Sequence, residues 1–178
     1  MKFFSDNKTQ PALHIKKAEK NPVAAFVGKG NLHIADPGST VFLRKSSEMI
    51  GTAKLADCYA LIVIGEQRDG KKIIGLNHWI GENKTAEAVL ELLKNTMLRM
   101  GVMEESFFSC ALGGDKDHPD NTEELKKLQE KGIIQEVRYE INKEPSEITD
   151  LLIQITDKGV ELQYFTENNS PAPKSKPL

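Results

Sequence analysis

The stretch that decides the fold is TAKLADCYALIVIGEQRDGKKIIGLNHW, residues 52–79. Two apolar segments, 58–64 and 72–76, flank the turn Gln67–Gly70, and its Asp-Gly pair is typical of a tight turn between antiparallel strands. We therefore predict a β-hairpin. Both faces of the first strand are apolar, so we expect this strand to be central and covered on each side. Cys58, Ala60, Ile62 and Ile64 would share one face, and Tyr59, Leu61 and Val63 the other.

The hairpin predicts a juxtaposition of Cys58 and His78. These residues lie at nearly equal distances from the turn, so antiparallel pairing brings them to the same end of the hairpin, to within one or two residues of register. A thiol beside an imidazole is the minimum that cysteine nucleophilic catalysis requires. Two plainer interpretations stay open at this point: a buried structural cysteine and a hydrogen-bonded surface histidine.

Elements outside the hairpin predict an α+β fold. Residues 85–100 have apolar side chains at helical spacing, with Thr85 as the N-cap and Gly101 after the last turn. A shorter helix is expected at 121–131. Strands are expected at 39–43, 106–112, 133–141, 151–155 and 160–165. We predict a central mixed β-sandwich with the long helix and the short helix packed on it, because strict βαβ alternation is absent.

The domain prediction has three parts. Residues 1–30 are polar and rich in lysine, and we assign them to an N-terminal extension. Residues 31–166 contain the predicted strands and helices and form the domain. Residues 167–178 are polar and rich in proline, so we expect a disordered tail.

Composition narrows the class of protein. A net charge of −2 over 178 residues gives no broad basic surface, so no nucleic-acid partner is expected. The first residues lack an apolar signal-peptide core, and the longest apolar run is too short to span a bilayer, so membrane insertion is not expected. Cys58 and Cys110 are expected to be free thiols in a reducing compartment. Residues 115–120 lack the glycine and glutamate of a calcium loop, and we expect neither a metal nor a cofactor.

Four features together resemble the CheD family of chemoreceptor glutamine deamidases, which is related in fold to cytotoxic necrotizing factors and the Burkholderia lethal factor. Thr52 precedes Cys58 by six positions, and the segment Gly75–Trp79, GLNHW, is similar to the family's Gly-Met-Asn-His-Phe. A helix that ends in Met-Gly follows. The segment 107–114 then resembles a family strand that ends in a double glycine. The resemblance covers roughly residues 32–135.

The resemblance implies a cysteine-dependent protein glutamine deamidase without a cofactor. Cys58 would be the nucleophile and His78 the base, and Thr52 would hold the second imidazole nitrogen through its hydroxyl or its backbone carbonyl. The partner would be a protein that carries the target glutamine. The residues assigned to substrate or oxyanion binding are Leu55, Ala56, Asp57 and Asn77.

This chain departs from the family at two places. Leu55-Ala-Asp-Cys58 stands where the family has Leu-Gly-Ser-Cys or Leu-Ser-Gly-Cys, and a later Gly-Gly-x-x-Gly-Arg segment is missing. Three functions therefore stay open: a bacterial effector or toxin, a chemotaxis receptor deamidase, and a non-catalytic binding module that keeps the fold. The protein would be cytoplasmic, or delivered into a host cell without a cleavable signal peptide. We expect Asp57 to point away from the thiol, because adjacent strand residues face opposite sides.

Overall fold

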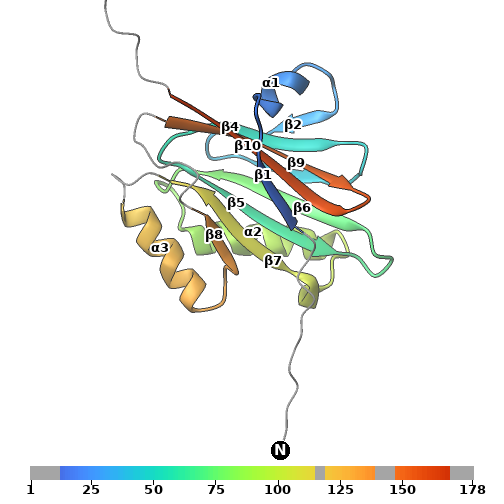
Figure 1. Ribbon diagram of the computed structural model, residues 1–178. Coiled ribbons are helices and arrows are strands. Elements are labelled where there is room, and N and C mark those ends of the chain that lie inside the picture. The colour runs from blue at the N-terminus through green and yellow to red at the C-terminus, as the bar shows by residue number, and fades with distance from the viewer. Residues whose placement is uncertain (1–12, 115–118, 139–146, 169–178) are drawn as a thin grey trace, which may run out of the picture.

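Two five-stranded β-sheets pack face to face in the computed structural model, which describes residues 13–114, 119–138 and 147–168 (Figure 1). Sheet A contains, in spatial order, β1 (Leu13–Lys17), β10 (Gly159–Asn168), β9 (Glu147–Thr156), β4 (Met49–Leu55) and β2 (Leu32–Ile34). Sheet B contains β3 (Thr40–Leu43), β6 (Lys72–Trp79), β5 (Tyr59–Glu66), β7 (Phe108–Gly113) and β8 (Glu136–Arg138). Both sheets mix parallel and antiparallel pairs, and the predicted α+β class is confirmed.

The predicted hairpin forms the centre of sheet B. Strands β5 and β6 pair from Tyr59 opposite Trp79 to Glu66 opposite Lys72, and Gly70 in the turn has a φ of +84°. β5 lies between β6 and β7, and both of its faces are apolar because a hydrophobic core covers each of them. The predicted faces are also correct. One set packs in the core between the sheets (Ala60, Ile62, Ile64), and the other packs under the helices (Tyr59, Leu61, Val63).

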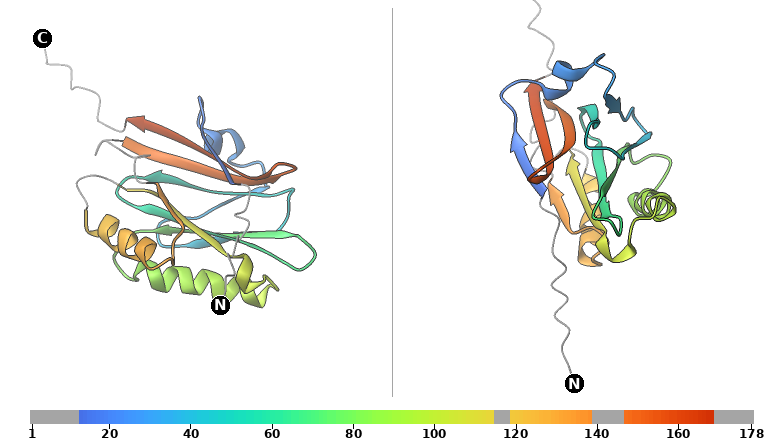
Figure 2. Two further views of the ribbon diagram at one scale, coloured as in Figure 1. Left: turned by 60° about the horizontal axis from the view of Figure 1, so that its bottom comes forward. Right: turned by 90° about the vertical axis from the view of Figure 1, so that its right-hand side faces the viewer.

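Helices α2 (Ala86–Arg99) and α3 (Pro119–Glu130) cover the side of sheet B that faces away from sheet A (Figure 2). Thr85 caps α2 as predicted, since its hydroxyl accepts the Ala88 N–H at 3.1 Å. Gly75 lets α2 approach β6 closely, because a Cβ at this position would lie 3.1 Å from Leu93 Cδ2. A short 3₁₀ helix, η1 (Glu104–Ser106), precedes β7.

Sheet A contains elements that the sequence analysis does not predict. β4 has no counterpart there, because Gly51, Thr52 and Lys54 interrupt its apolar pattern. β1 and helix α1 (Pro22–Phe26) lie inside the predicted N-terminal extension. β1 pairs in parallel with β10, and α1 packs on the outer face of sheet A, so this part of the extension is integrated with the domain.

Several predicted elements have different ends in the structure. β7 starts at Phe108, because η1 occupies residues 104–106. β10 continues to Asn168, which pairs with Glu147, so residues 167 and 168 of the predicted tail lie in a strand. β8 covers only residues 136–138 of the strand predicted at 133–141. The rest of the predicted tail and the end of that strand lie outside the described residues.

Candidate active site

Thr52 and His78 form a buried pair that joins the two sheets. Thr52 lies on β4 in sheet A and His78 on β6 in sheet B, and their side chains are 0% and 1% exposed. Thr52 Oγ1 lies 2.8 Å from His78 Nδ1. The hydrogen bond implied by the family resemblance is therefore present, and it is made by the threonine hydroxyl.

A third group fixes the direction of this hydrogen bond. Thr52 Oγ1 donates to the Ala35 carbonyl at 2.8 Å. A hydroxyl has one proton, so Thr52 accepts from His78 Nδ1–H. A neutral imidazole held in this way has its lone pair on Nε2. Nε2 is buried and has no hydrogen-bond partner within the described part of the chain, so the pair presents an unused basic nitrogen.

Cys58 lies on the same face of the hairpin as His78. Ala60 pairs directly with His78, and both Ala60 and Cys58 pack in the core between the sheets, so the Cys58 and His78 side chains face sheet A. The partly buried Cys58 packs against the core between the sheets, and its thiol is free. The thiol does not donate to His78. It donates to Asp57 Oδ1 at 3.7 Å, a long contact even for sulfur.

The surroundings keep both groups in their neutral forms. Burial raises the pKa of Cys58 to about 12, and the carboxylates of Asp57 and Glu82 act in the same direction. Burial lowers the pKa of His78, although the Ala35 carbonyl and two carboxylates partly oppose this shift. At neutral pH the resting site therefore contains a thiol and a neutral imidazole, and no thiolate–imidazolium pair.

The expected orientation of Asp57 is wrong. That expectation extends the alternation of β5 back to residue 57, but β5 begins only at Tyr59 and residues 56–57 form a bend. The bend turns the Asp57 carboxylate towards the neighbouring thiol, whose hydrogen bond it accepts. The carboxylate consequently opposes thiolate formation.

β4 contains a β-bulge near its end. The pairing of β4 with β9 shifts between Thr52 and Leu55, and Lys54 has a left-handed φ of +57°. The Asp150 carboxylate, 9% exposed, accepts the Lys54 N–H at 2.8 Å and the Asn21 Nδ2–H at 2.6 Å. Asp150 thereby fixes the backbone where the chain leaves Thr52.

The double glycine at the end of β7 holds the backbone of Cys58. Gly114 N–H donates to the Cys58 carbonyl at 3.0 Å. A Cβ on Gly113 would lie 2.6 Å from that oxygen, and a Cβ on Gly114 would collide with the Tyr59 ring. Both glycines also have positive φ angles, +123° and +87°. The double glycine is therefore needed because the end of β7 passes too close to the backbone of Cys58 and Tyr59 to leave room for side chains.

Three of the predicted oxyanion residues lie near the thiol. Leu55 is wholly buried in the core between the sheets, at the end of β4. Ala56 and Asp57 are partly exposed in the bend that leads to Cys58. Any contribution of Leu55 to oxyanion binding would have to come from its backbone, because its side chain fills the core.

The structure does not bring Asn77 to this pair. Asn77 Nδ2 donates to the Ser39 carbonyl at 3.0 Å and to Thr40 Oγ1 at 2.9 Å. Adjacent residues of a strand face opposite sides, so Asn77 points towards α2 and His78 towards sheet A. Asn77 therefore belongs to a different surface.

Sequence reasoning missed two residues of the site, Ala35 and Asp150. Ala35 acts through its carbonyl, which no side-chain motif encodes. Asp150 lies 96 positions after the backbone N–H that it binds. Only an aspartate inside an otherwise apolar strand pattern could have drawn attention to it.

Comparisons with known proteins give little support for an assignment. No family model matches the chain, and no curated protein matches it. The chain is similar to a solved structure, the C-terminal domain of CNFy from Yersinia pseudotuberculosis, with 9% identity and a TM-score of 0.37. The likeness covers 76% of this chain but only 55% of that one. A likeness this weak supports no inference about activity.

No helix among the described residues combines the length and the apolar composition needed to cross a membrane. In the same ranges, no group of three or more histidine, cysteine, aspartate or glutamate side chains is arranged to hold a metal ion.

Proposed function

We propose that the protein is a cysteine-dependent amidohydrolase that converts a glutamine side chain of a target protein to glutamate. One observation carries the proposal: the Thr52–His78 pair holds a lone pair on His78 Nε2, on the face of the hairpin that also carries Cys58. The spacing of Thr52 and Cys58 and the GLNHW segment support glutamine as the substrate group.

The proposed reaction has two halves. Cys58 Sγ attacks the side-chain amide carbon of glutamine as its proton passes to His78 Nε2, and that proton then leaves with ammonia. The product of this half is a thioester between Cys58 and the substrate. Water attacks the thioester and gives a proton to Nε2, which returns it to the departing sulfur. Glutamate and the free thiol result.

Substrate binding must change the resting hydrogen bond of the thiol. In the proposal, the Cys58 S–H leaves Asp57 Oδ1 and turns to Nε2. Backbone N–H groups of the segment 55–58 would stabilise the oxyanion. Thr52 has no proton to transfer. Its role is to keep the Nδ1–H tautomer, so that Nε2 can accept.

The proposal can be tested without knowing the target. The purified full chain is incubated with bacterial and animal cell lysates, and mass spectrometry then searches for glutamines converted to glutamate. We expect conversion at one or a few sites with the wild-type chain and none with Cys58→Ser. The lysate that contains the target would separate an effector role from a chemotaxis role, and the missing Gly-Arg segment favours the effector.

A second function is favoured by the contact between Cys58 and Asp57. A thiol with a pKa of about 12 beside a carboxylate fits a binding module that keeps the fold without catalysis. Neither lysate would then contain a glutamine whose conversion depends on Cys58. The module would still bind its protein partner, and Cys58→Ser would leave that binding unchanged.

A further inference from the structure

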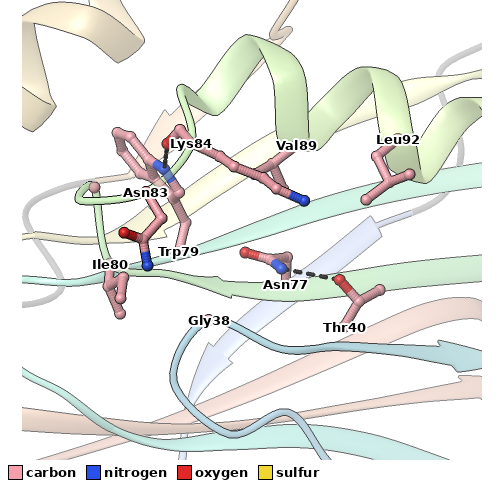
Figure 3. A pocket seen from close by; sticks show the side chains of 10 residues that line it. Gly38, Thr40, Asn77, Trp79, Ile80, Asn83, Lys84, Val89 and Leu92 are labelled. Atoms are coloured by element: carbon pink, nitrogen blue, oxygen red, sulfur yellow. Dashed lines mark hydrogen bonds between the residues drawn. The ribbon is translucent and has the colours of Figure 1, made fainter.

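A pocket of about 210 Å³ opens on the α2 side of β6 (Figure 3). It lies between β6, the loop before β3 and the N-terminal half of α2. Sites for drug-sized molecules have volumes of roughly 300–1,000 Å³, so this pocket suits a single amino-acid side chain.

The floor of the pocket is polar and oriented. Both hydrogens of Asn77 Nδ2 are used, on the Ser39 carbonyl and on Thr40 Oγ1, so Asn77 offers a ligand only its acceptor, Oδ1. Figure 3 shows this oxygen turned away from Thr40. An acceptor in this position suits a peptide N–H.

Lys84 provides the charge of the pocket. Its side chain runs along α2 past Val89, and its nitrogen lies above Asn77 in Figure 3. Lys84 makes no ion pair within the described ranges, so its ammonium group is free to pair with a ligand. An unpaired ammonium above a neutral floor favours an anionic group.

The remaining wall is apolar. Val89 and Trp79 are buried, whereas Leu92 on α2 is 46% exposed at the rim. A ligand with a short aliphatic stem could cover Leu92 while its charged end meets Lys84. Aspartate and glutamate side chains have this combination of a short stem and a carboxylate.

The pocket lies close to the proposed active site along the chain. Asn77 and Trp79 flank His78 on β6, and Gly38 N–H donates to the His78 carbonyl at 2.8 Å. Continuing the register of the hairpin by one residue places Ile80, another lining residue, opposite Cys58. A polypeptide bound at this end of the hairpin could reach both places.

We infer that this pocket binds an aspartate or glutamate side chain of the target protein, with the carboxylate on Lys84 and a backbone N–H of the target on Asn77 Oδ1. The inference rests on the proposed function, because it makes the pocket the recognition site for the same substrate. The class of possible substrates is then restricted to proteins that carry an acidic residue near the target glutamine.

The test measures binding in Cys58→Ser, so that it does not depend on catalysis. Trp79 is the only tryptophan in the chain and lines the pocket, so its fluorescence reports occupancy. The probes are blocked pentapeptides of glycine with glutamate, glutamine or lysine at the centre. We expect the glutamate peptide to change the emission saturably and to bind about tenfold more tightly than the glutamine peptide.

Two variants made in that background complete the test. Lys84→Gln should remove the preference for glutamate over glutamine. Lys71→Gln, which removes an exposed lysine at the turn end of the hairpin, should keep it. Equal affinity for the two peptides, a preference that survives Lys84→Gln, or no change in Trp79 emission would overturn the inference. A negative lysate experiment with intact glutamate binding would instead reject the proposed catalysis.

Discussion

Cys110 lies on β7 and Cys58 directly precedes the neighbouring strand β5, and the two cysteines differ in what their sulfur atoms can reach. Cys110 is wholly buried in the core between the sheets, and Cys58 is half-buried directly before β5. Burial raises the pKa of both thiols. The shift therefore does not distinguish a nucleophile from a core residue. The distinction lies in the neighbours, because only Cys58 shares the end of the hairpin with a histidine whose Nε2 lone pair is unused.

The largest expected effect separates the two cysteines by activity. Cys58→Ser should lower glutamine conversion in the lysate assay by about 10³-fold or more, because a hydroxyl is a far weaker nucleophile with a neutral imidazole as its only base. Cys110→Ser should leave conversion largely intact. Equal losses in two variants that are both folded by circular dichroism would mean that the wrong cysteine is assigned.

A smaller effect is expected from the residue that holds the imidazole. Thr52→Val removes the acceptor of the Nδ1–H bond, so the tautomer and ring orientation are no longer fixed, and conversion should fall about 10²-fold. Thr149→Val is the matched control, since Thr149 is also a buried strand threonine whose hydroxyl bonds to another residue, Thr166. An equal loss in the control would show that the fall reflects stability alone.

A still smaller effect is expected from substituting Asp57, and it concerns the reactivity of the Cys58 thiol. Asp57→Asn removes a charge that raises the pKa of Cys58, so that pKa should fall and iodoacetamide should react about tenfold faster with Cys58 at pH 8. The rate is measured by peptide mass spectrometry. Asp69→Asn, in the turn at the other end of the hairpin, is the control. An unchanged rate in Asp57→Asn would place the carboxylate away from the thiol.

The smallest effect is expected from deleting the buried sulfur. Cys110→Ala leaves a small cavity in the core, and the free energy of unfolding should fall by about 1–2 kcal/mol in urea denaturation. Cys58→Ala, at a partly exposed position, should cost less. The reverse order would make Cys58 the more important packing residue.

The parts of the fold that could be predicted from the sequence depend on local signals. The hairpin follows from Asp69-Gly70 between two apolar runs, and α2 follows from its 3.6-residue periodicity and its Thr85 cap. β4 was missed because Gly51 and Lys54 break its apolar pattern, and Lys54 even adopts a left-handed φ at the bulge.

The candidate site was only partly predictable for a related reason. The hairpin register predicts that Cys58 and His78 lie at the same end of the hairpin. Thr52 and His78 lie on different sheets, so strand pairing cannot predict their contact. Only the family resemblance predicts it. The predicted orientation of Asp57 is wrong because strand alternation does not hold in the bend before Tyr59. The Ala35 carbonyl, which sets the tautomer, carries no side-chain signal.

The most direct test of the account uses the γ-p-nitrophenyl ester of a blocked glutamate, which would form the proposed thioester without a target protein. We expect release of nitrophenolate with a glutamyl group on Cys58 in the mass of the intact chain, retained in Cys110→Ser and lost in Cys58→Ser and His78→Gln. Burial lowers the pKa of His78, so the pH at which the rate falls to half its maximum should lie below the pH at which an ordinary imidazole titrates. Acylation at another residue, or an equal rate in His78→Gln, would contradict the account.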